Sequence, residues 1–175
     1  MKGTIIKCLA EMVVEKHGGE ATWQQIMDVA AVPKHTLILA TSDIDDAQAG
    51  RLFTATTKVL RLSWEQVADA FGEHWCCAYG PRVYGRTFDR FASAREMILG
   101  LDQVHVDVTR SLTNATPPRF SYAWKDADTL EVTYASRRGL IDLYVGLARG
   151  VGLRYKEPLH VRKLSETLVE IHFGA

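Results

Sequence analysis

His105 lies in a segment whose apolar residues recur with a helical period. This segment is expected to form a helix from Ser93 to Leu112. The apolar residues of the same face are Met97, Leu101, Val104, Val108 and Leu112. A buried imidazole without a partner costs roughly 1–3 kcal/mol. His105 is therefore expected either to bond to a neighbour, as an ordinary core histidine does, or to ligate a metal.

The residues around His105 do not complete a metal site by themselves. No H-x-x-x-H pattern and no nearby cysteine accompany it, and the adjacent carboxylates are only Asp102 and Asp107. Asp102 is interpreted as a charge on the helix surface. A metal held by one histidine takes its other ligands from a cofactor, and haem is the common case.

A second group of polar residues, Tyr134, Ser136 and Arg138, lies at the end of an expected strand. Because side chains alternate along a strand, these three should share one face. Two hydroxyls and a guanidinium suit an anion, since Arg can bind a carboxylate through two nitrogens while hydroxyls donate to the remaining lone pairs. Sulfate, phosphate or a propionate would each fit, and a solvated strand end is the alternative interpretation.

The first half of the chain is expected to be helical, because apolar residues recur at three- and four-residue spacing as far as about Ala78. The first helix should end at His17-Gly18-Gly19. Thr22 and Ser63 are expected N-caps, each followed three residues later by a glutamine. We expect Gly80 and Pro81 to interrupt the helical pattern.

The second half contains alternating segments typical of strands. Residues 119–134 predict a hairpin after the diproline Pro117-Pro118, and two more strands are expected over 159–163 and 168–173. A helix over residues 140–155 separates the two pairs. A helical N-terminal half followed by ββαββ with antiparallel pairing is an α+β class.

The composition limits the class of protein. The 175 residues suit a single domain, residues 1–175, and Lys plus Arg equal Asp plus Glu at 21 each. With zero net charge, we expect no contact with nucleic acid or membrane. No apolar run approaches the ~20 residues that span a bilayer. Three cysteines, two of them adjacent, fit no disulfide framework and indicate a reducing, cytoplasmic compartment.

Several segments, in order, give the chain a likeness to a known family. These segments are residues 1–5 (MKGTI), Phe71-Gly72, residues 101–105 (LDQVH), residues 116–119 (TPPR), the Y-x-S-x-R run of residues 134–138 and Gly146-Leu147. The chain resembles the H-NOX family, the haem nitric oxide/oxygen binding domains of bacterial sensors and of soluble guanylate cyclases. The resemblance covers essentially the whole sequence and implies haem b, iron protoporphyrin IX, bound between the two halves.

The resemblance also implies a role for individual residues. His105 would be the proximal iron ligand, and Tyr134, Ser136 and Arg138 would bind the haem propionates. Pro118 would press on the porphyrin and hold it out of plane. Ile5 would lie against the haem.

The resemblance further implies which gas is bound. Oxygen-binding members carry a distal tyrosine in the helix after the Y-x-S-x-R strand, and ungapped alignment from Tyr134 places Leu143 there. Without that donor, the chain is expected to bind nitric oxide and carbon monoxide and to exclude oxygen. Tyr144, Trp75 and Tyr79 are alternative donors, which would make the protein an oxygen sensor.

The domain is expected to signal gas binding through a partner protein and not through a reaction of its own, because no Ser/His/Asp set, nucleotide loop or carboxylate pair is evident. Nitric oxide would weaken the bond between iron and His105, and the freed helix would shift. The resemblance implies a histidine kinase, a cyclic-dinucleotide enzyme or a chemotaxis receptor domain as partner. A haem-free small-molecule-binding domain and a haem enzyme such as a peroxidase are the remaining alternatives.

Overall fold

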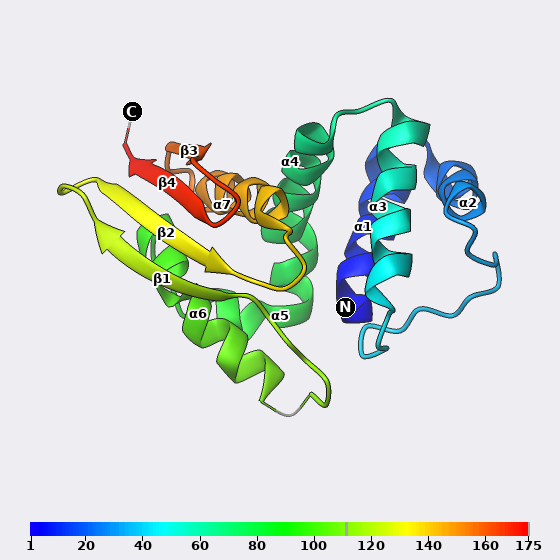
Figure 1. Cartoon of the computed structure of the whole chain (residues 1–175), viewed down its shortest axis with the longest axis horizontal. Helices are drawn as coiled ribbons and strands as arrows, with labels where there is room; N and C mark the ends of the chain where they lie inside the picture. The colour runs from blue at the N-terminus through cyan, green and yellow to red at the C-terminus, as the bar shows by residue number, and fades with distance from the viewer. Residues whose placement is uncertain (111, 175) are drawn as a thin grey trace. The chain divides into compact units, whose positions relative to one another are not determined.

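The computed structural model describes residues 1–110 and 112–174 and divides the chain into two compact units, Met1–Val67 and Ala68–Ala175. The helices and strands of each unit are labelled in Figure 1. No helix in the described part of the chain has both the length and the apolar character needed to cross a membrane.

The first unit is helical. It contains α1 (Gly3–Lys16), α2 (Gly19–Val29), α3 (Asp46–Leu60) and the beginning of α4 (Trp64–His74). α1 packs against α2, and α2 packs against α3. As predicted, α1 ends just before the glycine pair, where Gly18 and Gly19 adopt positive φ angles of 98° and 77°.

The two expected N-caps have different outcomes. Ser63 is confirmed, because its hydroxyl accepts from the Gln66 N–H at 3.1 Å and the Gln66 side chain accepts from the Ser63 N–H at 2.8 Å. Thr22 is wrong as a cap, since α2 already begins at Gly19. The left-handed Gly18 starts that helix, and the Thr22 hydroxyl donates back to the Gly18 carbonyl at 3.1 Å from within the first turn.

The interruption expected at Gly80 and Pro81 is wrong. α4 leads into a π-helical turn, η1 (Trp75–Tyr79), and then into α5 (Gly80–Phe88). Pro81 lies in the first turn of α5, directly after Gly80, whose N–H still donates to the Trp75 carbonyl across the π-helical turn. A single turn of wider π-helix absorbs the change of register between the two helices.

The second unit places two helices against one antiparallel sheet. Its strands are β1 (Arg119–Trp124), β2 (Thr129–Ala135), β3 (Leu159–Lys163) and β4 (Leu168–Phe173), in the order β1-β2-β4-β3. α6 (Ala94–Thr109) packs on β1 and α7 (Ile141–Tyr155) on β3 (Figure 1). The α+β class and the ββαββ order are confirmed. The core between helices and sheet is built from alternate strand residues such as Leu130, Val132, Val169 and Ile171.

α6 is shorter than the expected helix. It begins within one residue of the predicted start. Ser93 is its N-cap, whose hydroxyl accepts from the Glu96 N–H at 3.1 Å. It ends at Thr109, and Leu112 instead forms a turn in which its N–H donates to the Thr109 carbonyl at 2.9 Å. Residue 111 lies outside the described residues. Leu112 therefore continues the apolar period without continuing the helix.

α4 and α7 cross at glycines. Gly146 and Gly150, four apart in α7, predict close approach of another surface, either haem or a neighbouring strand. The close approach is confirmed, but the surface is the backbone of α4. A Cβ added to Gly146 would lie 2.1 Å from the Ala68 carbonyl oxygen, and one added to Gly150 would lie 2.2 Å from that of Gly72. The backbones of the two helices are thus in direct contact.

Candidate functional site

His105 lies on α6 and faces the segment that enters β1. Its Nδ1 is 3.3 Å from the Pro118 carbonyl oxygen, and its ring centre is 5.5 Å from that of Phe120. In the tautomer with the proton on Nδ1, the first contact is an N–H···O hydrogen bond and Nε2 keeps its lone pair. The partner that a buried imidazole requires is therefore a backbone carbonyl from the diproline segment.

The surroundings of His105 favour the neutral ring. Burial lowers the pKa of His105, and the hydrogen bond with Pro118 and the charge of Asp102 offset only part of that effect. A neutral imidazole is the form that coordinates a metal.

Asp102 is not the free surface charge that the sequence suggested. One turn before His105, its carboxylate accepts from Arg119 Nε at 2.8 Å and Nη2 at 2.6 Å, and from the Phe120 N–H at 2.9 Å. Three hydrogen bonds therefore join α6 to the beginning of β1. We call this set of contacts between Asp102, Arg119 and Phe120 the α6–β1 clamp. It lies beside the contact between His105 and Pro118 and keeps the two segments in register.

The clamp makes stability depend on pH. Hydrogen bonds from Arg119 hold the pKa of Asp102 at about 2, below its ordinary value of 3.8. A depressed pKa means that the folded state favours the ionised carboxylate, so the clamp is at full strength above pH 3.8 and is lost as the pH falls through about 2. Asp102→Asn is expected to lower the free energy of unfolding by about 1 kcal/mol at neutral pH. Urea unfolding at several pH values measures this difference.

The pH profile is what distinguishes the clamp from a general effect of substitution. The difference between wild type and Asp102→Asn should shrink as the pH is lowered from 4 toward 2. Asp89→Asn, at the exposed C-cap of α5, is a matched control and should change stability little at any pH. A deficit in Asp102→Asn that stays constant down to about pH 2 would contradict the role given to the carboxylate.

The Tyr134, Ser136 and Arg138 group is brought together, but not by the face of a strand. β2 ends at Ala135, so the expectation that all three share a strand face is wrong. The chain turns after Ala135 because the Ser136 hydroxyl accepts from the Arg138 N–H at 3.2 Å. Burial raises the pKa of Tyr134, and a hydrogen bond with Ser136 opposes that rise. A local turn therefore keeps the two hydroxyls and the arginine close.

Arg138 also reaches the segment that leads to Pro118. Its guanidinium donates to the Thr116 carbonyl at 2.7 Å and to the Thr116 hydroxyl at 3.2 Å. A guanidinium has five N–H donors in a fixed plane, a geometry that suits a carboxylate. The turn after β2 and the segment before β1 are thus linked on the side of the unit that carries His105.

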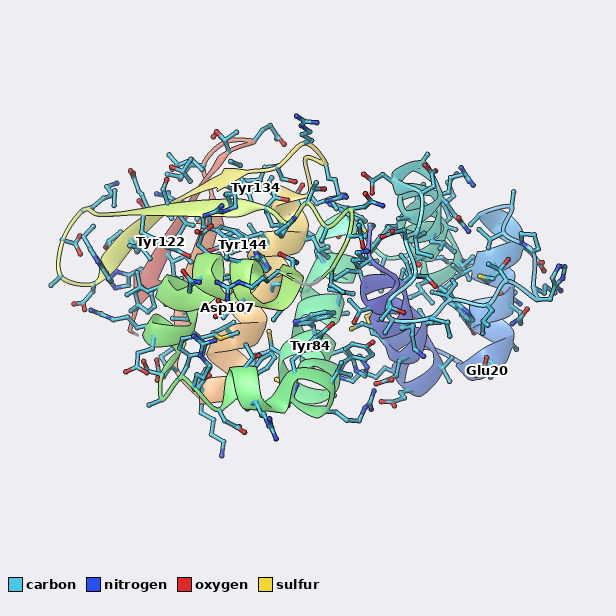
Figure 2. All side chains as sticks on the ribbon, turned by 90° about the horizontal axis from the view of Figure 1, so that it is seen from below. Glu20, Tyr84, Asp107, Tyr122, Tyr134 and Tyr144 are labelled. Carbon is cyan, nitrogen blue, oxygen red and sulfur yellow. The ribbon has the colours of Figure 1, made fainter. Side chains whose placement is uncertain are left out.

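Leu143 and the three alternative hydrogen-bond donors expected from the sequence lie on α7 and η1. Leu143 is buried and apolar. Tyr144, next to it, packs its ring against Phe120 at 4.8 Å and Tyr134 at 6.0 Å between ring centres (Figure 2). Its hydroxyl is buried without a hydrogen-bond partner among the described residues. Tyr144 therefore belongs to the aromatic core beside His105.

The other two candidate donors are also aromatic core residues. Trp75 stacks on Phe71 with ring centres 5.8 Å apart and lies 5.5 Å from the ring of Tyr79. Tyr79 is buried. Ile5 is on α1 in the other unit, and its proposed contact with haem stays a prediction.

The residues present fit a haem ligated by one histidine. His105 Nε2 makes no hydrogen bond within the described part of the chain, while Nδ1 is held by Pro118. A backbone carbonyl that accepts from the Nδ1 N–H is the usual arrangement for a metal-binding histidine, because it fixes the ring and raises its basicity. Tyr134, Ser136 and Arg138 supply donors suited to carboxylates such as propionates.

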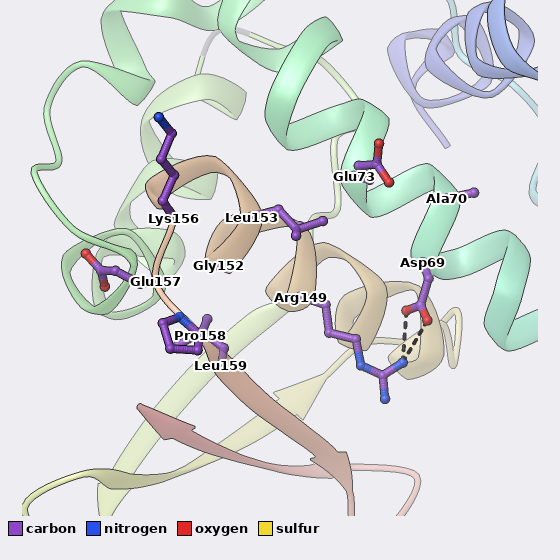
Figure 3. Close-up of a pocket in the computed structure, with 11 residues that line it drawn as sticks. Asp69, Ala70, Glu73, Arg149, Gly152, Leu153, Lys156, Glu157, Pro158 and Leu159 are labelled. Carbon is purple, nitrogen blue, oxygen red and sulfur yellow. Dashed lines mark hydrogen bonds and ion pairs between the residues drawn. The ribbon is translucent and has the colours of Figure 1, made fainter. Parts of the chain in front are cut away.

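A groove of about 780 Å³ lies elsewhere in the second unit, along α4, the end of α7 and the start of β3 (Figure 3). Arg149 crosses one end and donates to both oxygens of Asp69 at 2.9 and 3.0 Å. Glu73, Leu153 and Lys156 are among the other lining residues. None of the residues expected to bind haem lines this groove, so it is not the candidate site.

Comparisons with known proteins place this geometry in a family. The model of the family described as Haem-NO-binding matches residues 2–163. A crystal structure of an H-NOX protein from S. oneidensis in the Fe(II)NO state has a TM-score of 0.88 at 17% identity, with all of both chains covered. An unliganded Fe(II) H-NOX variant from K. algicida gives 0.84 at 19% identity, covering all of this chain and 97% of that one.

An oxygen-binding H-NOX domain related to soluble guanylate cyclases, in its oxygen complex, gives a TM-score of 0.82 at 21% identity and covers all of this chain and 96% of that one. This chain therefore has the same fold as H-NOX proteins whose structures are an Fe(II)NO state, an unliganded state and an oxygen complex. The match of the family model over nearly the whole chain shows more than the fold. This chain belongs to the Haem-NO-binding family, the H-NOX domains that act as haem-based gas sensors.

Proposed function

We propose that residues 1–175 form one sensor domain that binds nitric oxide and carbon monoxide at ferrous haem b and excludes oxygen. The observation that carries the proposal is His105, in a chain of the Haem-NO-binding family: its Nδ1 is held by the Pro118 carbonyl at 3.3 Å, while Nε2 makes no hydrogen bond to any residue that the structure describes. The iron of the haem would supply the position at which a diatomic gas binds.

The chain's own residues would hold the group in the following way. His105 would ligate the iron through Nε2, with its orientation fixed by Pro118 and by the α6–β1 clamp. Tyr134, Ser136 and Arg138 would donate hydrogen bonds to the propionates. Pro118 would contact the porphyrin beside His105, and Ile5 of α1 would cover the haem with an apolar side chain.

Titration of the purified chain with haem tests this part of the proposal. We expect saturation at one equivalent, with an absorption band typical of a histidine ligand. A chain that takes up no haem would favour the alternative of a haem-free small-molecule-binding domain, in which His105 is only a core residue.

Selectivity against oxygen is proposed to come from Leu143. An apolar side chain cannot donate a hydrogen bond, and oxygen depends on such a bond more than nitric oxide or carbon monoxide does because it carries more negative charge when bound. Leu143→Tyr is expected to raise oxygen affinity roughly ten- to more than a hundredfold, the equivalent of a ~1.5–3 kcal/mol hydrogen bond to a charged group. Oxygen titration of the reduced variant measures the change.

Leu143→Phe is the matched control, because it adds the same ring without the hydroxyl. The tyrosine variant should exceed the phenylalanine variant in oxygen affinity, while the two should bind carbon monoxide alike. If wild type itself binds oxygen stably, Tyr144, Trp75 or Tyr79 supplies a donor and the protein is an oxygen sensor. Equal oxygen affinities of the two variants would refute the place given to position 143.

We propose that a movement of α6 transmits gas binding to the partner. His105 lies near the middle of this helix, and the α6–β1 clamp joins the same helix to the sheet. Release of His105 would leave the clamp and the Pro118 contact to set the position of α6, so the helix can move between two arrangements. We propose that a partner protein reads this change and that the domain itself is not an enzyme. A histidine kinase, a cyclic-dinucleotide enzyme or a chemotaxis receptor domain would suit that role.

A further inference from the structure

Two histidines face each other across neighbouring strands on the side of the sheet that α6 and α7 do not cover. His160 of β3 and His172 of β4 are direct partners in the antiparallel register. Both are exposed, and their ring centres are 6.5 Å apart. The residues that flank them along the strands, Val161 and Phe173, point into the core instead. The pair therefore stands on rigid backbone with its rings in solvent.

A third residue orients one of the rings. Thr129, opposite His172 in the register of β2 and β4, has its hydroxyl 3.1 Å from His172 Nδ1. This hydrogen bond leaves Nε2 of His172 as the nitrogen open to a ligand. In metal-binding histidines, the ring nitrogen that does not bind the metal generally forms a hydrogen bond with a neighbouring group.

We propose that His160 and His172 together bind one divalent transition-metal ion, such as zinc. Imidazole nitrogens prefer ions of this class to magnesium or calcium. Two imidazoles that share a zinc ion at Zn–N distances of ~2.0–2.1 Å have ring centres about 5–6 Å apart. The difference from 6.5 Å can be closed by a small rotation of the exposed His160 side chain about χ1 and χ2, which leaves the hydrogen bond between Thr129 and His172 in place.

The neighbouring charged residues determine how many ligands the protein can offer to the zinc ion. Glu170, on the same face of β4, already accepts from Lys125 at 3.0 Å and Arg162 at 2.8 Å, so both cations are paired with it. Among the described residues of this unit, no third histidine, cysteine or carboxylate lies close enough to the pair to complete a three-ligand group. Water would fill the remaining positions, and the affinity should be that of a two-ligand chelate.

Zinc titration of the full chain against a chromophoric chelator at neutral pH tests the proposal. Wild type should bind one zinc ion per chain at this site. His160→Asn and His172→Asn should each weaken binding at least tenfold, because removal of a ligand costs at least as much as the 10- to 100-fold loss typical of an outer partner. His35→Asn, which removes an exposed histidine in a loop, should bind as wild type does.

The test is kept separate from the proposed haem site. His105→Gly should retain the zinc response, because His105 is on α6, which covers the opposite face of the sheet. Far-UV circular dichroism without zinc should be the same for wild type and both asparagine variants, since the substituted side chains are in solvent. Absence of zinc binding by wild type, or binding that survives both asparagine substitutions, would overturn the proposal whatever the haem experiments show.

Discussion

Replacing His105 with glycine is expected to lower haem affinity more than about 100-fold, because loss of the iron ligand should exceed the 10- to 100-fold cost of losing an outer partner. The loss should be reversed in part by free imidazole, which can occupy the space left by the side chain and ligate the iron. Haem titration followed by absorption spectroscopy, with and without imidazole, measures both effects. Rescue by imidazole distinguishes a ligand from a residue that only supports the fold.

Gln103→Gly is the matched control for this substitution. It lies on the exposed side of the same helix and carries the same cost of about 1 kcal/mol for glycine in a helix interior. The control should bind haem as wild type does. A His105→Gly variant with the wild-type affinity and spectrum would show that His105 is only a core residue.

Gly72→Ala is expected to lower the free energy of unfolding by about 3 kcal/mol, near the upper end of what overpacking usually costs. A Cβ at this position would lie 2.0 Å from the carbonyl oxygen of Gly146, and 2.6 Å from the backbone nitrogen of Leu147. Backbone atoms of a packed helix cannot rotate away as a flexible side chain can, so α4 and α7 must separate. The melting temperature should fall by roughly 6–12 °C for a chain of this size.

Gly50→Ala is the control, and it should change the free energy of unfolding in the opposite direction. Gly50 lies in α3, is exposed, and has nothing within 4 Å of an added Cβ. Alanine there should raise the free energy of unfolding by ~0.8–1 kcal/mol through helix propensity alone. Thermal and urea unfolding of both variants give the comparison. If Gly72→Ala were as stable as wild type, the close contact between the two helices would be wrong.

The sheet could be predicted closely from the sequence because one of its faces is buried and the other is not. The strands predicted over 159–163 and 168–173 coincide with β3 and β4, and residues 140–155 predict α7 to within one residue. In β4, Val169, Ile171 and Phe173 are buried while His172 is exposed, which is the alternation that the pattern contains. The hydrophobic period specifies both the elements and the face that they bury.

The parts that could not be predicted depend on partners distant in the sequence or on local hydrogen bonds. Pro81 could mark the end of one helix or the start of the next, and only the π-helical turn before it decides in favour of continuation. The strand pattern through Ser136 and Arg138 is ended by one side-chain to backbone bond that leaves no hydrophobic signal.

The residues of the candidate site could be predicted from the sequence, but the hydrogen bonds that join them could not. His105 is identifiable because a polar ring on an apolar stripe needs a partner, yet that partner, the Pro118 carbonyl, belongs to a segment 13 residues away. Asp102 was missed because an acidic residue on a helix is usually solvated. Its place one turn before His105, together with Arg119 directly after the diproline, is the signal that could have indicated the clamp.

The absorption spectrum of the reduced, haem-loaded protein shows whether the chain is a nitric oxide sensor that uses His105 as its iron ligand. It should be recorded without oxygen, then with nitric oxide, and then, in a separate sample, in air. We expect a Soret band typical of ferrous haem with one histidine ligand, a shift of that band with nitric oxide that indicates loss of His105 from the iron, and no stable oxygen-bound spectrum in air. A stable oxygen-bound spectrum in air would refute the proposed exclusion of oxygen, and a nitric oxide spectrum that retains the histidine ligand would refute the proposed release of His105.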